Sequence, residues 1–84
     1  MEKSLFTAEY RLLCRMLREK REEAGLTQVD VAGRLEVPQT YISKWERGGR
    51  RLDFLQVRHF CKAIGITLGE FVGEFERRVG KGKR

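Results

Sequence analysis

The sequence predicts a small all-α protein in which five helices surround one core. Apolar residues recur at three- and four-residue spacing in five segments, and this is the period of an α-helix. Glycine or proline separates these segments at Gly25, Pro38, Gly48 and Gly65. The chain has 84 residues, which suits one domain that buries about 60 to 65 per cent of its unfolded surface. We therefore expect an arm of residues 1–9, a domain of residues 10–79 and a basic disordered tail of residues 80–84.

The first long helix is expected from about residue 8 to residue 24, with Thr7 as a candidate N-cap. One face carries the apolar residues Tyr10, Leu13, Met16, Leu17 and Ala24. The opposite arc is charged. Its arginines, Arg11, Arg15 and Arg18, are expected to form i,i+4 ion pairs in a solvated face rather than a second binding patch.

Residues 28–46 predict two short helices rather than one. Val31 and Leu35 are one helical turn apart, and Ile42 and Trp45 repeat the apolar stripe after a break. Pro38 explains the break, because it disfavours helical geometry at the preceding residue and has no N–H to donate. Thr27 is expected to cap the first helix in a capping box with Asp30. Gly48 and Gly49 are expected to end the second helix, so its range is about 39–47.

This stretch resembles the XRE or Cro-repressor type of helix-turn-helix regulator, which has a lambda repressor-like fold. The resemblance covers about residues 10–75 and is carried by Gly25 to Gln28, Val31, Ala32, Leu35, Val37 to Lys44, Glu46 to Gly48 and Arg50 to Asp53. It implies a DNA-binding domain whose helix at 39–47 enters the major groove. One position departs from the family, because the turn residue that is often glycine is Glu36 here. A positive φ at this residue would cost about 1 kcal/mol.

Two further helices follow. Leu52 returns to the core and Asp53 is a candidate cap for a helix that continues to Gly65. Thr67 is a candidate cap for a last helix from residue 68 to about residue 78. This helix has a broad apolar face that is more than one small core is expected to need, and such a face usually marks an interface. We therefore expect a homodimer that pairs through Leu68, Phe71, Val72 and Phe75.

The net charge of +6 is unevenly distributed. Residues 1–36 have equal numbers of acidic and basic side chains, whereas residues 37–62 have six basic side chains and two acidic ones. The excess therefore coincides with the outer face of the helix at 39–47 and the loop after it. A concentration of basic side chains of this kind is typical of a surface that binds the phosphates of nucleic acid.

The outward positions of the helix at 39–47 are the candidate base-reading residues. Gln39 can pair with adenine through N7 and N6, and Lys44 can reach O6 and N7 of guanine. Thr40 offers a hydroxyl or a methyl group, and Ser43 is small enough for close approach. The order of expected importance is Gln39, Lys44, Thr40 and Ser43.

A second set of residues is expected to contact the DNA backbone. The N-terminus of the helix that starts at Gln28 suits a phosphate, and the resemblance assigns the Gln28 side chain to the same group. Arg47, Arg50 and Arg51 belong to a loop predicted to be flexible and basic, which can follow the backbone beside the groove. For Tyr41, a phosphate contact by the hydroxyl and core packing by the ring are equally compatible with the sequence.

Other functional classes have little support. No phosphate-binding loop, metal cluster or nucleophile with a base is evident, so we expect no enzyme activity, cofactor or metal. Cys14 and Cys61 lack a CxxC or Cys/His pattern and are expected to be buried free thiols, and His59 is expected at the surface. No apolar run is long enough to span a membrane, and no signal peptide is evident. We expect a cytoplasmic protein of bacterial or phage origin, associated with the nucleoid.

The function predicted from these observations is sequence-specific binding of double-stranded DNA as a transcriptional regulator, and as a repressor in particular. Pairing through the last helix would place two reading helices about 34 Å apart on one face of the DNA. The alternative is an antitoxin or adaptor-type helix-turn-helix protein whose main role is to bind a protein partner, such as a toxin or another regulator. A partner that co-purifies with the chain would distinguish the two.

Overall fold

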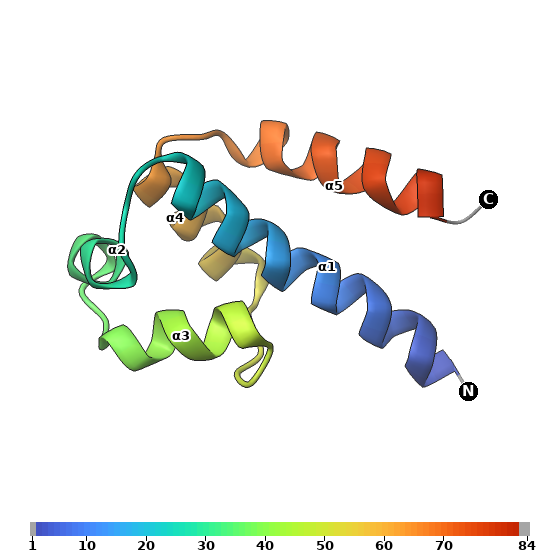
Figure 1. Cartoon of the computed structure of the whole chain (residues 1–84), viewed down its shortest axis with the longest axis horizontal. Coiled ribbons are helices and arrows are strands. Elements are labelled where there is room, and N and C mark those ends of the chain that lie inside the picture. The colour runs from blue at the N-terminus through green and yellow to red at the C-terminus, as the bar shows by residue number, and fades with distance from the viewer. Residues whose placement is uncertain (1, 83–84) are drawn as a thin grey trace.

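The computed structural model describes the backbone of residues 2–82 and the side chains of residues 7–81. This range folds into five α-helices without a strand (Figure 1). The all-α architecture predicted from the sequence is confirmed. The helices are α1 (Glu2–Glu23), α2 (Gln28–Leu35), α3 (Gln39–Arg47), α4 (Phe54–Ile64) and α5 (Leu68–Gly82).

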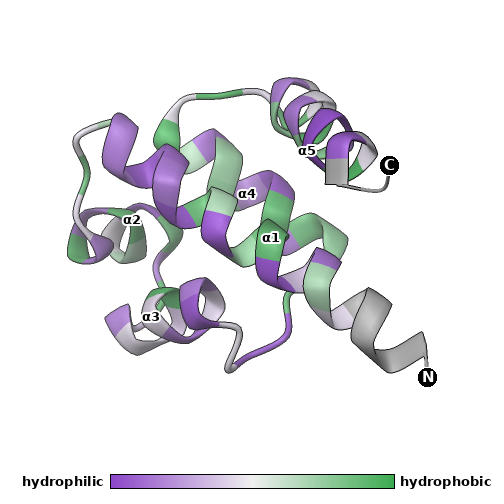
Figure 2. Ribbon diagram, turned by 45° about the vertical axis from the view of Figure 1, so that its right-hand side comes forward, coloured by the Kyte–Doolittle hydropathy of each residue, from purple (hydrophilic) through white to green (hydrophobic). Residues whose placement is uncertain are grey.

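The long helix α1 crosses the middle of the molecule and separates α5 from α3 (Figure 1). It packs against α3, α4 and α5, while α2 packs against α3 and α4. Each helix ribbon shows green and purple segments in alternation (Figure 2), as expected for helices that bury one apolar face. The arrangement leaves the outer side of α3 uncovered by any other helix of the described chain.

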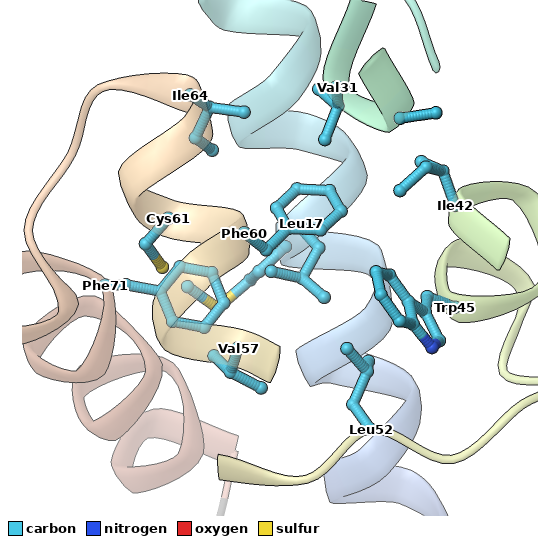
Figure 3. Packing of buried hydrophobic residues seen from close by; sticks show 12 residues of the cluster. Leu17, Val31, Ile42, Trp45, Leu52, Val57, Phe60, Cys61, Ile64 and Phe71 are labelled. Atoms are coloured by element: carbon cyan, nitrogen blue, oxygen red, sulfur yellow. The ribbon is translucent and has the colours of Figure 1, made fainter. Parts of the chain in front are cut away.

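The core lies where all five helices meet, and α2 contributes Val31 and Ala32 to it (Figure 3). Its largest fully buried side chains are Phe60, Phe71, Met16, Leu17 and Ile42. Trp45 is only 3% exposed, which confirms that it is a core residue and excludes its ring from base stacking. Cys14 and Cys61 are buried free thiols, as the sequence predicts. Burial raises the pKa of the Cys61 thiol to about 11, so it stays protonated at neutral pH.

Three helices begin with a capping box, in which the cap and the third helical residue exchange hydrogen bonds. The two residues of each box are Thr27 with Asp30, Asp53 with Gln56, and Thr67 with Glu70. The prediction of all three caps is confirmed. Glycines in the left-handed conformation follow α1, α3 and α4, with φ of +76° at Gly25, +82° at Gly48 and +87° at Gly65.

Two helix ends differ from the sequence prediction. Helix α1 already begins at Glu2, so Thr7 lies inside it and is not its N-cap. Residues 2–9 contain no glycine or proline to stop the helix from extending upstream. Helix α5 runs to Gly82 rather than about Arg78, so residues 80–82 of the predicted disordered tail are helical. Residue 1 of the arm and residues 83–84 of the tail lie outside the described range.

The predicted dimer face of α5 needs a correction at Phe71. This ring is only 2% exposed and packs into the core of its own chain, so it is not available to a partner. Leu68 and Phe75 are half-buried against the same core, and only Val72, at 40%, is clearly exposed. The apolar face of α5 therefore serves mainly to close the core, because four short or amphipathic helices leave one side of Phe60 and Cys61 to be covered (Figure 3).

Charged side chains tie α5 to α1 outside the core. Lys20 Nζ lies 2.6 Å from Glu74 Oε1, and Arg78 Nη2 lies 2.9 Å from Glu19 Oε1. Arg78 also pairs with Glu74 one turn earlier on α5. The Lys20 ammonium and then the Arg78 guanidinium lower the pKa of the Glu74 carboxyl.

Candidate nucleic-acid interface

The turn between α2 and α3 fixes the angle of the two helices. Glu36 adopts the left-handed conformation, with φ 59° and ψ 44°, and its N–H donates to Gly33 O at 3.3 Å. Val37 N–H donates to Ala32 O at 3.1 Å, which completes the helix end. Pro38 then takes an extended conformation directly before α3. The positive φ considered for Glu36 from the sequence is therefore present.

Helix α3 buries one side and presents the other to solvent. Ile42, Trp45 and Glu46 are buried. Gln39, Thr40 and Lys44 are exposed and Ser43 is half-buried, so the four predicted base-reading residues share the outer side of the helix. Lys44 and Arg47 place two positive charges in the last turn of this helix.

A chain of hydrogen bonds joins three helices beneath this surface. Arg21 of α1 donates to both carboxylate oxygens of Glu46 on α3, at 2.6 and 3.0 Å. Gln28 Nε2 donates to Glu46 Oε1 at 3.0 Å, and Gln28 Oε1 accepts from Gln39 Nε2 at 2.6 Å. The predicted phosphate-binding and base-reading glutamines are thus in direct contact. The two amides continue the hydrogen bonds from the buried Glu46 carboxylate to the exposed Gln39.

The buried ion pair is the feature that the sequence analysis missed. Arg21 and Glu46 are each 8% exposed, and the hydrogen bond to Glu46 raises the pKa of Arg21. A signal was present in the sequence, because Arg21 follows Leu17 by four residues and Glu46 follows Ile42 by four. Each charge therefore continues an apolar stripe, and two opposite charges in such positions indicate a buried pair.

The predicted basic loop after α3 is held by several contacts. Gly49 N–H and Arg50 N–H both donate to Lys44 O, at 2.8 and 3.3 Å. The Arg50 guanidinium lies 4.0 Å from the centre of the Tyr41 ring. The sequence predicts a flexible loop here, whereas the structure shows a loop anchored to the end of α3 and to an aromatic ring.

The Tyr41 side chain packs between an aromatic ring and a guanidinium. Its ring packs edge-on against Trp45, with centroids 6.1 Å apart, and carries Arg50 on one face. The residue is only half-buried. Packing is therefore one role of Tyr41, and a phosphate contact by its hydroxyl remains a prediction.

The described part of the chain has neither a membrane span nor a metal-binding cluster. Within residues 2–82, no helix is both long enough and apolar enough to cross a membrane. Within the same range, no three His, Cys, Asp or Glu side chains gather as a metal site would require.

A helix-turn-helix family model matches residues 17–71, from the middle of α1 to the first turn of α5. The chain belongs to the XRE-type helix-turn-helix family. The matched segment contains α2 and α3 with the turn at Glu36, and the Arg21–Glu46 pair lies within it.

Curated relatives of this helix-turn-helix protein include two bacterial proteins. It is 33% identical over 60 residues to the HTH-type transcriptional regulator DdrOP3 of Deinococcus deserti. The aligned segment covers 71% of this chain and 46% of the relative. It is 28% identical over 58 residues to the control protein C.MunI of a Mycoplasma species. This aligned segment covers 69% of this chain and 78% of the relative. The chain thus spans less than half the length of DdrOP3.

Solved structures share the fold. An XRE-family like protein from Pseudomonas syringae pv. tomato superimposes with a TM-score of 0.86 at 37% identity, covering 90% of this chain and 93% of the other. The restriction-modification controller protein C.Esp1396I, solved as a tetramer with its 35 base-pair operator, gives a TM-score of 0.75 at 24% identity, with coverage of 84% and 92%. At that identity the likeness to C.Esp1396I concerns the fold alone.

Proposed function

We propose that this helix-turn-helix protein is a transcriptional regulator that binds double-stranded DNA sequence-specifically. The observation that carries the proposal is the outer side of α3, where Gln39, Thr40 and Lys44 are exposed on a helix whose other side is fixed in the core. A helix of this kind fits the major groove, where its first turns reach base edges. The match to a regulator of Deinococcus deserti supports the same function.

In the proposed complex, base readout and backbone contacts come from different residues. Gln39, Thr40, Ser43 and Lys44 face the base edges. Arg47, Arg50 and Arg51 are exposed residues at the end of α3 and in the loop after it, and they neutralise phosphates. The N-terminus of α2, where Gln28 is half-buried, supplies a further phosphate site.

We further propose that the protein acts as a homodimer and represses transcription by occupying its operator. One helix reads only a few base pairs, so a second copy would extend the site with two-fold symmetry. The proposed interface is the apolar groove between α4 and α5. Phe54, at 66% exposed, and Val72, at 40%, lie on the rim of this groove, and Leu13, Leu68 and Phe75 line it.

The test is the selection of binding sites from a random duplex DNA pool by the purified protein, at low and at higher salt. We expect a two-fold symmetric motif whose half-sites are one helical turn apart. The Gln39→Ala variant is selected in parallel with the wild-type protein. It should lose the base preference at one position of each half-site.

Two other results would contradict parts of the proposal. Binding that shows no preferred sequence and vanishes as salt rises would mean that the basic surface binds DNA only nonspecifically. That result would favour the alternative function, which is binding to a protein partner. A single asymmetric half-site bound by one copy of the chain would retain DNA recognition but contradict the homodimer.

A further inference from the structure

The loop that follows α3 lies against α1, a helix outside the two-helix motif (Figures 1 and 2). Its residues Arg50 and Arg51 are both exposed, and Leu52 is buried. Sequence reasoning treats Tyr10 of α1 as one member of an apolar stripe. In the structure, this tyrosine contacts all three consecutive loop residues.

The hydroxyl of Tyr10 bridges the backbone of the loop. It accepts a hydrogen bond from Leu52 N–H at 3.0 Å and donates one to Arg50 O at 3.3 Å. Burial raises the pKa of the Tyr10 phenol, so the hydroxyl keeps the proton that it donates. The path of the backbone at residues 50–52 is therefore fixed from α1.

The ring of Tyr10 carries the next charge of the loop. The Arg51 guanidinium lies over it, 4.1 Å from the ring centre, just as Arg50 lies over Tyr41. A guanidinium that stacks on an aromatic face keeps its N–H edge free for a phosphate. Two adjacent arginines, both exposed residues, are thus held on separate rings.

We propose that Tyr10 is a positioning residue for DNA backbone binding, which holds Arg50 and Arg51 in place to contact phosphates beside the groove that α3 enters. This inference rests on the proposed DNA-binding function. Tyr10 acts through the two arginines and not by touching DNA itself. It therefore affects the affinity for every duplex and leaves the preferred sequence unchanged.

The experiment measures the dependence of DNA affinity on salt for Tyr10→Leu, Tyr10→Phe and Arg51→Ala in the full chain. Each phosphate contact contributes about 0.9 to the slope of log affinity against log salt. We expect Tyr10→Leu to be shallower than the wild-type protein by about one unit or more on specific and unrelated duplexes alike. Tyr10→Phe, which keeps the ring and loses the hydroxyl, should fall between the two.

A double variant tests whether Tyr10 acts through Arg51. Each single change makes the salt slope shallower. In the double variant of Tyr10→Leu with Arg51→Ala, the loss of slope should be smaller than the sum of the two single losses, because both changes remove the same contact. Ile64→Val, at the opposite end of the core from Leu52 (Figure 3), is the control for a loss of stability without a change in the loop. Its slope should equal that of the wild-type protein.

The outcomes separate this inference from the proposed function. A folded Tyr10→Leu protein with the wild-type slope, or strictly additive effects in the double variant, would overturn the role of Tyr10 while DNA binding stands. A wild-type protein that binds no duplex at any salt would overturn the proposed function itself. Circular dichroism at the binding temperature verifies that each variant is folded.

Discussion

Glu46 on α3 is held by Arg21 on α1 through two hydrogen bonds, at 2.6 and 3.0 Å, between side chains that are each 8% exposed. This bidentate pair joins α3 to α1, the longest helix of the domain. A third bond, from Arg21 Nη1 to Leu26 O at 2.8 Å, connects the same guanidinium to the segment between α1 and α2. One guanidinium therefore contacts both α3 and the segment that leads into α2.

Removing one partner of this pair should destabilise the protein strongly. Glu46→Ala leaves the Arg21 guanidinium buried without its carboxylate, and we expect a loss of about 3 to 5 kcal/mol in the free energy of unfolding. Urea denaturation provides the measurement. The double replacement of Arg21→Met with Glu46→Leu should recover most of the loss, and a double variant as unstable as Glu46→Ala would contradict this account.

The turn at Glu36 should become more stable with glycine. Glu36→Gly removes the strain of a side chain at φ 59°, and we expect a gain of about 0.5 to 1 kcal/mol in the free energy of unfolding. Thermal denaturation gives the comparison. Glu36→Gln is the control, since it removes the charge and keeps the strain, and a gain as large in that variant would attribute the effect to charge instead.

The exposed ammonium of Lys44 should affect which DNA sequence is preferred. We expect Lys44→Ala to lose about 1 to 3 kcal/mol on the cognate site and to relax specificity at one base pair. Competition binding with single-position variants of the selected site measures both effects. An equal loss on all sequences would instead make Lys44 a phosphate contact.

The two apolar residues Val72 and Phe71 of α5 should behave differently when changed. Val72→Asp places a charge on the exposed rim of the groove between α4 and α5. The variant should sediment as a monomer, and its free energy of unfolding should be nearly unchanged. Phe71→Ala opens a cavity beneath it and should lose about 3 to 5 kcal/mol in the free energy of unfolding. If Val72→Asp sediments with the wild-type mass, the dimer surface lies elsewhere.

Acid should weaken the attachment of α5 to α1. The pKa of Glu74 is lower in the folded protein than in the unfolded chain, so its ion pairs stabilise the fold above the ordinary carboxyl pKa of about 4.3. That stabilisation is lost as the pH falls through the lowered pKa. Glu74→Gln should be less stable at neutral pH and should lose less stability on acidification, as followed by thermal denaturation at several pH values.

The sequence sufficed for the features that depend on local patterns. The caps at Thr27, Asp53 and Thr67 were predictable because each lies directly before a new apolar stripe, and Gly25, Gly48 and Gly65 because they end one. The start of α1 was not predictable, because Thr7 is a residue type that often caps a helix but no helix-breaking residue comes before it. Phe71 was misassigned because the sequence shows the width of an apolar face but not how many helices remain to cover the core.

At the candidate site, the outer positions of α3 follow from helical periodicity, whereas the contacts beneath them do not. Gln28 with Gln39 joins α2 to α3, and Tyr10 with Arg51 joins α1 to the loop after α3. The spacing of these residues along the chain has no helical meaning. Only the opposite charges on the apolar stripes of α1 and α3 carried a readable signal for one such contact.

The hydrogen-bond chain from Arg21 to Gln39 has a consequence for how the proposed DNA specificity could change. Position 39 is constrained on its inner side, since its amide donates to Gln28 while Gln28 donates to Glu46. A replacement there must suit a new base and also leave Gln28 with a donor. Thr40 and Lys44 lie outside that chain, and selection can exchange them for other side chains without disturbing the core. New specificities should therefore arise first at these two positions.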